Sequence, residues 1–178
     1  LGNDEFGRLL RSDLARSDVN IDDVAETGSS SGTAIVTVDK EGENRIVVVP
    51  GSNMLLQRET IEQYLKRQGS AVQYFVSQFE IPLDHIRYAF GKVKDYGAVT
   101  VLNPSPMQSI PHELIKCTDI FVLNELELTQ AAGIAEVISS PDETAQVALG
   151  WAQNIGNKIV IVTLGEKGLV AIQDGQVV

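Results

Sequence analysis

Hydrophobic side chains change their spacing along the chain, and each change predicts a new element. Apolar residues recur at helical spacing over residues 5–16 and predict an amphipathic helix. Two apolar runs, at residues 33–38 and 45–49, are separated by the polar segment 39–44, which is typical of a β-hairpin. A second helix is expected over residues 58–67.

From residue 71 onward, strand-like and helical patterns alternate. Strands that alternate with helices are joined by right-handed crossovers and form a mainly parallel sheet. The sequence therefore predicts an α/β fold with helices flanking the sheet. We expect strands over residues 71–78, 98–103, 119–123 and 158–163, helices over 84–96, 111–116, 125–132 and 142–155, and a final hairpin whose first strand is 169–172.

The composition indicates one domain whose partners are small molecules. With 178 residues, 43% of them hydrophobic, the chain can bury a core but is short for two domains. Its net charge of −10 argues against nucleic acid or an anionic membrane, since both favour clustered Lys and Arg. No apolar run is long enough to span a membrane and no signal peptide is visible, so we expect a cytoplasmic protein.

Cysteine and histidine are too scarce for a disulfide or a zinc site. Cys117 is the only cysteine, and His85 and His112 lie far apart in the sequence. Any metal would then be bound by carboxylate and phosphate oxygens, which suits Mg²⁺.

Polar residues follow several predicted strands at their carboxyl ends, where open α/β sheets bind ligands. Asn124 and Glu127 follow the strand that ends at residue 123 and fit a phosphate or metal site. The alternative is a capping box, a common helix start that uses the same two residue types at the same spacing. Glu80 also follows an apolar run and could accept a hydrogen bond from a hydroxyl, although a lone Glu is more often simply solvated.

Residues 163–168 follow the next predicted strand. The two glycines of this segment, Gly165 and Gly168, can direct backbone N–H groups into a concave turn suited to anions. The segment is not a Walker loop, because the Gly-Lys-Ser/Thr ending is absent, and an ordinary glycine turn is the alternative.

Eight short motifs, taken in order, resemble the ribokinase-like carbohydrate kinases of the phosphofructokinase-B type. No single motif is decisive, but their order is specific and the resemblance covers essentially the whole chain. The hairpin turn and the Leu-Asn-Pro-Ser-Pro segment are most similar to the ribose-specific members. The motifs lie at residues 2–7, 31–34, 41–44, 50–53, 79–83, 102–106, 124–127 and 163–168.

The resemblance implies a partial ribokinase-like, Rossmann-type fold with a lid hairpin at about residues 33–50. It implies ATP-dependent phosphorylation of D-ribose to ribose 5-phosphate with Mg²⁺, and family members can also use a monovalent cation. By this similarity, the sugar would be contacted by Glu80, Ala34 and Val36, the ATP phosphates by Asn124, and Mg²⁺ by Glu127 through water. The nucleotide cleft would begin with Thr163, Gly165, Glu166, Lys167 and Gly168.

Two motifs of that family are not found in the sequence. One is an N-terminal strand with a sugar-binding Asn and Asp and a following glycine-rich segment, and the other is a Gly-Ala-Gly-Asp motif that carries the catalytic Asp and the anion hole. The first residue is Leu1 rather than Met, so we expect both ends to be cuts and residues 1–178 to be an incomplete kinase domain. We expect this chain to be inactive alone, because losing a general base typically removes about 10²- to 10⁴-fold of rate.

Other functions stay open beside this one. The chain could be a noncatalytic remnant that self-associates or binds a partner, or it could come from a kinase of the same family for another sugar or a nucleoside. A dinucleotide-binding domain is disfavoured, because no Gly-x-Gly-x-x-Gly follows a strand.

The hairpin predicts self-association. Val36 shares one face with Ala34 while Ile35 takes the other, so the first strand is apolar on both faces. A two-stranded ribbon is marginal alone in water and needs a surface on each side. We therefore expect a homodimer through the lid hairpin, which the family resemblance also implies. The alternative is that one chain buries both faces.

Overall fold

The protein is represented by a computed structural model that describes residues 1–42, 44–135, 138 and 140–178. These residues form two compact units. The first comprises Leu1–Tyr64 with Glu80–Pro82, and the second comprises Leu65–Phe79 with Leu83–Val178. The sequence predicts that both units belong to one kinase domain with a lid hairpin, and this stays a prediction.

Asp4 fixes the start of the first helix. Its Oδ1 atom accepts a hydrogen bond from the Gly7 N–H at 2.8 Å, so Asp4 is the N-cap. Gly7 is required here, because a Cβ at that position would lie 2.0 Å from the carbonyl oxygen of Gly2. The elements of this part of the chain are α1 (Glu5–Arg16), β1 (Thr33–Val38), β2 (Asn44–Val49), the 3-10 turn η1 (Gly51–Leu55) and α2 (Arg58–Gln68), which crosses into the second unit.

Strands β1 and β2 form the predicted antiparallel hairpin, in which Thr33 pairs with Val49. Asp39 begins its turn by accepting the Glu41 N–H on its side chain at 3.0 Å. Ile35 and Val36 point to opposite faces and are 56% and 53% exposed, so neither face is buried within the described part of the first unit. The family motif at residues 41–44 includes Glu43, which lies outside the described residues.

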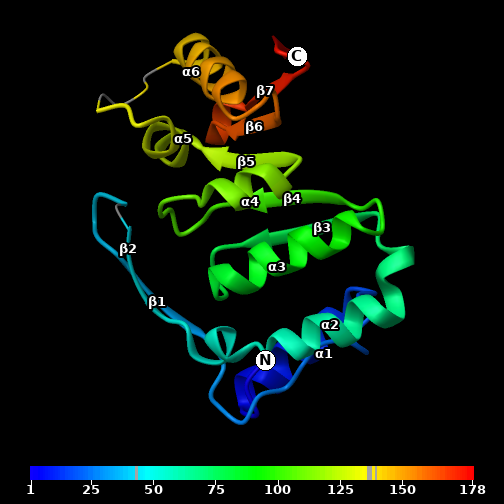
Figure 1. The fold of residues 1–178 in the computed structure, drawn as a ribbon. Coiled ribbons are helices and arrows are strands. Elements are labelled where there is room, and N and C mark those ends of the chain that lie inside the picture. Colours follow the sequence, from blue (N-terminus) through cyan, green and yellow to red (C-terminus); the bar gives the residue numbers. More distant parts are fainter. Residues whose placement is uncertain (43, 136–137, 139) are drawn as a thin grey trace. The chain divides into compact units, whose positions relative to one another are not determined.

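The second unit is built on a six-stranded sheet with the order β3-β4-β5-β6-β7-β8 (Figure 1). Strands β3 to β6 run parallel, and β7 and β8 are added as an antiparallel hairpin. This confirms the predicted α/β fold with a mainly parallel sheet. The strands are β3 (Tyr74–Gln78), β4 (Val99–Asn103), β5 (Ile120–Asn124), β6 (Ile159–Thr163), β7 (Leu169–Gln173) and β8 (Gln176–Val177). The helices are α3 (Leu83–Lys94), α4 (His112–Cys117), α5 (Glu125–Ala132) and α6 (Pro141–Asn154), with 3-10 turns η2 (Gly69–Ala71) and η3 (Gly165–Lys167).

The predicted element bounds agree with the structure to within two residues, apart from the start of β3. The sequence places this start at residue 71, but the strand begins at Tyr74. Residues Gly69–Ala71 form η2 instead, and the Val72 N–H donates to the Gly69 carbonyl at 3.2 Å. The run from residue 71 is apolar, but its first part is held in a turn. No helix in the described part of the chain is both long and apolar enough to cross a membrane.

Aromatic contacts place helices α3 and α6 on one face of the sheet. Phe75 of β3 meets Phe90 of α3 edge to face, with ring centroids 5.9 Å apart. Phe121 of β5 meets Trp151 of α6 in the same way at 5.1 Å. The strand register puts Phe75 and Phe121 on the same side, so α3 and α6 cover the same face. Because β4, β5 and β6 are parallel neighbours, their carboxyl ends lie together along one edge of the sheet.

Candidate functional site

Asn124 and Glu127 form a reciprocal capping box at the carboxyl end of β5. The Glu127 N–H donates to Asn124 Oδ1 at 2.8 Å, and the Asn124 N–H donates to Glu127 Oε2 at 2.9 Å. The box satisfies two backbone donors at the start of α5. The capping alternative is therefore part of the structure. It fixes both side chains at the carboxyl end of β5, the edge at which open α/β sheets generally bind ligands.

The capping box leaves one donor and one acceptor group unused. Asn124 is exposed and uses only its oxygen, so its Nδ2 amide donates no hydrogen bond within the described residues. Glu127 is only 7% exposed and binds through Oε2, so Oε1 is likewise unpaired among the described residues. An amide donor and a carboxylate oxygen, three residues apart, are thus held on one helix start.

Side chains of the neighbouring strands hold the end of β5. Asn103 at the end of β4 donates from Nδ2 to the Val122 carbonyl at 2.8 Å. Thr163 at the end of β6 donates from Oγ1 to the Leu123 carbonyl at 3.3 Å, and its Cα is the register partner of Asn124. The sequence predicts that a strand ends at Asn103. It does not predict the hydrogen bond to the neighbouring strand, because this bond depends on how the two strands align.

The glycine loop after β6 is a closed 3-10 turn. The Gly168 N–H donates to the Gly165 carbonyl at 3.2 Å, and the Lys167 N–H donates to the Leu164 carbonyl at 3.1 Å. Both glycines have positive φ, at 58° and 92°. Two amides of the predicted anion-binding turn are therefore used inside the loop. The side chains of Glu166 and Lys167 are exposed beside it.

The oxygen ligands at this edge of the sheet fit Mg²⁺ only if phosphate groups of a nucleotide supply further ligands. The described residues contain no group of three or more His, Cys, Asp or Glu that could enclose a metal ion. Glu127 is a single carboxylate with one unpaired oxygen. Mg²⁺ usually keeps several waters and is bound by one or two carboxylates together with substrate phosphates. Glu127 therefore fits a metal that a nucleotide brings, bound directly or through water.

The predicted sugar residues all belong to the first unit. Glu80 is exposed in the turn after β3, and Ala34 and Val36 lie on β1. The structure gives no hydrogen bond between Glu80 and the hairpin among the described residues. The predicted nucleotide residues, from Asn124 to Gly168, belong to the second unit.

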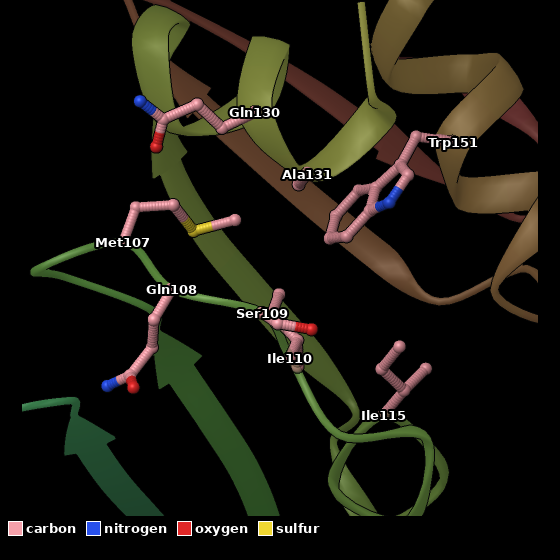
Figure 2. A pocket seen from close by; sticks show the side chains of 8 residues that line it. All are labelled: Met107, Gln108, Ser109, Ile110, Ile115, Gln130, Ala131 and Trp151. Carbon is pink, nitrogen blue, oxygen red and sulfur yellow. The ribbon is translucent and has the colours of Figure 1, made fainter.

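A cavity of about 400 Å³ lies elsewhere in the second unit (Figure 2). Trp151 projects from α6 toward the loop that follows β4, and Met107 of that loop faces α5. The lining contains no charged side chain, so the cavity is unsuited to a triphosphate. None of the predicted site residues lines it. The residues around it are Met107, Gln108, Ser109, Ile110, Ile115, Gln130, Ala131 and Trp151.

Comparison with known proteins identifies the family. The sequence profile of the pfkB family carbohydrate kinases matches residues 1–178. The bifunctional ribokinase/ribose-5-phosphate isomerase A of Fructilactobacillus sanfranciscensis is 37% identical over 170 residues, which are 94% of this chain and 31% of that protein. The ribokinase of Staphylococcus aureus is 30% identical over 171 residues, which are 94% of this chain and 54% of that protein.

The fold agrees with solved relatives. The structure of Arabidopsis thaliana ribokinase complexed with ribose and ATP matches 100% of this chain and 58% of its own, with a TM-score of 0.81 and 26% identity. This chain thus spans about half the length of a single-function relative. The whole-chain match confirms the resemblance seen in the eight motifs. Residues 1–178 belong to the pfkB family of carbohydrate kinases.

Proposed function

We propose that this chain is part of an ATP-dependent kinase that phosphorylates D-ribose to ribose 5-phosphate. The observation that carries this proposal is the capping box of Asn124 and Glu127 at the carboxyl end of β5, beside Thr163 of β6. Relatives named ribokinase, at 30% identity and above, support ribose as the sugar. A cytoplasmic site of action is part of the same proposal.

The nucleotide phosphates are bound at the edge formed by β5 and β6. The Glu127 N–H holds Asn124 Oδ1, so the Asn124 Nδ2 amide is presented as a donor to a phosphate oxygen. The α5 N-terminus favours negative charge nearby. Mg²⁺, when bound with the nucleotide, neutralises charge on the phosphates. Glu127 Oε1 would accept hydrogen bonds from the waters around this metal, and Thr163, Gly165, Glu166, Lys167 and Gly168 border the nucleotide.

The sugar is contacted by the first unit. The Glu80 carboxylate is exposed and accepts from a sugar hydroxyl, while Ala34 and Val36 cover the apolar side of the ring. In the reaction, the ribose 5-hydroxyl oxygen attacks the γ-phosphorus and the bond to the β-phosphate oxygen breaks, which releases ADP. The hydroxyl proton goes to the Asp of the Gly-Ala-Gly-Asp motif, which residues 1–178 do not contain. By the family resemblance, the complete protein could also use a monovalent cation.

The hairpin supports a second role, self-association. Its strands carry exposed apolar side chains on both faces, among them Ile35 and Val36. Such a ribbon gains stability when a second surface covers it. We propose a homodimer formed through this hairpin. A noncatalytic module that acts only by this pairing is the alternative function, and a kinase for another sugar or a nucleoside is a further one.

A hybrid enzyme tests the proposed reaction. Residues 1–178 replace the matching segment of S. aureus ribokinase, so that the hybrid contains the motifs absent here. We expect ATP- and Mg²⁺-dependent phosphorylation of ribose, with lower kcat/KM for other pentoses, fructose and adenosine. Preference for another substrate would replace ribose in the proposal. A folded hybrid without activity on any of them would favour the noncatalytic module.

A further inference from the structure

The cavity of about 400 Å³ takes no part in the proposed reaction, since none of the residues assigned to the sugar or the nucleotide lines it (Figure 2). All of its lining residues belong to the second unit. Its volume lies in the range of pockets that bind small molecules. We call it the Trp151 cavity, after the residue that projects into it from α6.

Apolar side chains form most of its wall. The indole ring of Trp151 and the side chain of Met107 extend into the cavity from α6 and from the loop after β4 (Figure 2). Trp151 is only 7% exposed and packs on Phe121, so its ring is fixed and presents only part of itself to the cavity. Aromatic edges and thioether sulfur both pack well against a flat aromatic ring. The wall therefore favours a planar aromatic ligand.

The loop that carries Met107 offers polar groups beside this apolar wall. The N–H and C=O groups of residues 107–110 make no hydrogen bond within the described part of the chain. The loop is held on both sides of this segment, because the Phe79 N–H donates to the Ser105 carbonyl at 2.9 Å and the Leu114 N–H donates to the Pro111 carbonyl at 2.9 Å. A ligand with both a donor and an acceptor could pair with such groups in place of water.

The cavity selects against charged ligands. The described residues that line it include no Asp, Glu, Lys, Arg or His, although 21% of the chain is Asp, Glu, Lys or Arg. A carboxylate or phosphate inside it would lose water without gaining a counter-ion. The net charge of −10 adds a general repulsion of anions. The expected ligand is therefore uncharged.

We propose that the Trp151 cavity binds an uncharged, planar heteroaromatic compound of one or two rings that carries an amide-type group. The rings pack against Trp151 and Met107, and the amide group exchanges hydrogen bonds with the loop at residues 107–110. This site is separate from the nucleotide edge of the sheet and does not depend on the proposed phosphorylation.

The indole N–H of Trp151 reports on the cavity directly. Trp151 is the only tryptophan of the chain, so an isotope-labelled sample gives a single indole N–H peak in NMR spectra. The probe is quinoline-3-carboxamide, and the matched control is its charged analogue quinoline-3-carboxylate. For the amide we expect a saturable shift of this peak with a dissociation constant of about millimolar or lower. The carboxylate should bind at least about tenfold more weakly, and millimolar MgATP should leave the affinity for the amide unchanged.

Substitutions in the wall test the location. Ala131→Phe fills the cavity from α5 and should weaken binding of the amide at least about tenfold. Gln146→Phe places the same side chain at an exposed position of α6 outside the cavity and should bind like wild type. Met107→Ala serves if Ala131→Phe does not fold, and its loss of the thioether contact should weaken binding roughly two- to tenfold.

Four results would each overturn the proposal. They are the absence of a saturable shift with the amide, a carboxylate that binds as well as the amide, displacement of the amide by MgATP, and unchanged binding in every folded cavity variant. The test uses neither ribose nor turnover, so a failure of the proposed reaction would leave its result unaffected.

Discussion

The backbone N–H and the hydroxyl of Ser31 both donate to the Asp4 carboxylate, each at 2.7 Å, although the two residues are 27 positions apart. The backbone hydrogen bond from Gly7, followed by those from Ser31, holds the pKa of Asp4 below its ordinary value of 3.8. One carboxylate thereby joins the start of α1 to the segment that leads into the hairpin.

Replacing Asp4 by Asn should lower the melting temperature at neutral pH. A carboxyl whose pKa is lowered by folding stabilises the fold above its unfolded pKa, and this contribution is lost as pH falls through the folded pKa. The stabilisation by the Asp4 carboxylate is therefore lost below pH 3.8. The difference in melting temperature between wild type and Asp4→Asn should shrink as the pH is lowered from neutral into this range. Asp22→Asn, in an exposed loop, serves as the control. Equal melting temperatures at neutral pH would contradict the role of Asp4.

The Asp119 carboxylate should make a second contribution to folding stability that is lost in acid. Burial raises its pKa, but hydrogen bonds from the Lys94 ammonium and from the Thr100 N–H outweigh this, so the pKa is lowered overall. Its contribution is present above pH 3.8 and lost below it. We expect Asp119→Asn to cost about 1–2 kcal/mol in urea unfolding at neutral pH, a low value for charged hydrogen bonds because the group is partly exposed. The control is Asp95→Asn, which removes a carboxylate in a more exposed ion pair with Lys92. A loss no larger than that of the control would refute the assignment.

The hairpin should mediate a dimer. Val36 and Val48 lie on the same face as the paired Ala34, and both are exposed. We expect sedimentation equilibrium to give a dimer for wild type and a monomer for Val36→Glu with Val48→Glu, because the dimer would bury both charges. Val19→Glu should leave the dimer intact. A monomeric wild type, or a folded double variant that still dimerises, would be incompatible with this interface.

Residues 1–178 alone should not phosphorylate ribose. In the proposed reaction the proton goes to the Asp of a Gly-Ala-Gly-Asp motif, which residues 1–178 do not contain. The loss of such a base alone typically costs about 10²- to 10⁴-fold in rate. A coupled ADP-release assay with ribose, ATP and Mg²⁺ should match a blank purified in the same way, while the hybrid with S. aureus ribokinase turns over. Turnover above the blank would contradict this prediction.

Glu127→Gln should weaken the effect of Mg²⁺ on ATP binding without unfolding α5. Gln still completes a capping box, so the helix start is kept while the carboxylate charge is lost. If the dissociation constant is about millimolar, millimolar MgATP stabilises the wild type by under about 1 kcal/mol. Titration calorimetry with and without Mg²⁺ measures the change. Glu125→Gln removes the same charge from the same helical turn and should behave like wild type. Unchanged Mg²⁺ dependence in Glu127→Gln would leave Glu127 with a capping role only.

Local patterns predicted much of the fold, but they did not predict how distant segments pair. The capping box of Asn124 and Glu127 was readable because both partners lie within one helical turn. The bond from Asn103 to the Val122 carbonyl depends on how β4 aligns with β5, which no short segment encodes.

The most direct test of the account is an NMR titration of the isotope-labelled chain with MgATP. We expect amide shift changes at residues 124–127 and 163–168, at the ends of β5 and β6, and smaller changes in Glu127→Gln. The lining of the 400 Å³ cavity, which includes Met107 and Trp151, should be unaffected. Changes confined to that cavity, or no changes at millimolar MgATP, would contradict the assignment of the nucleotide site.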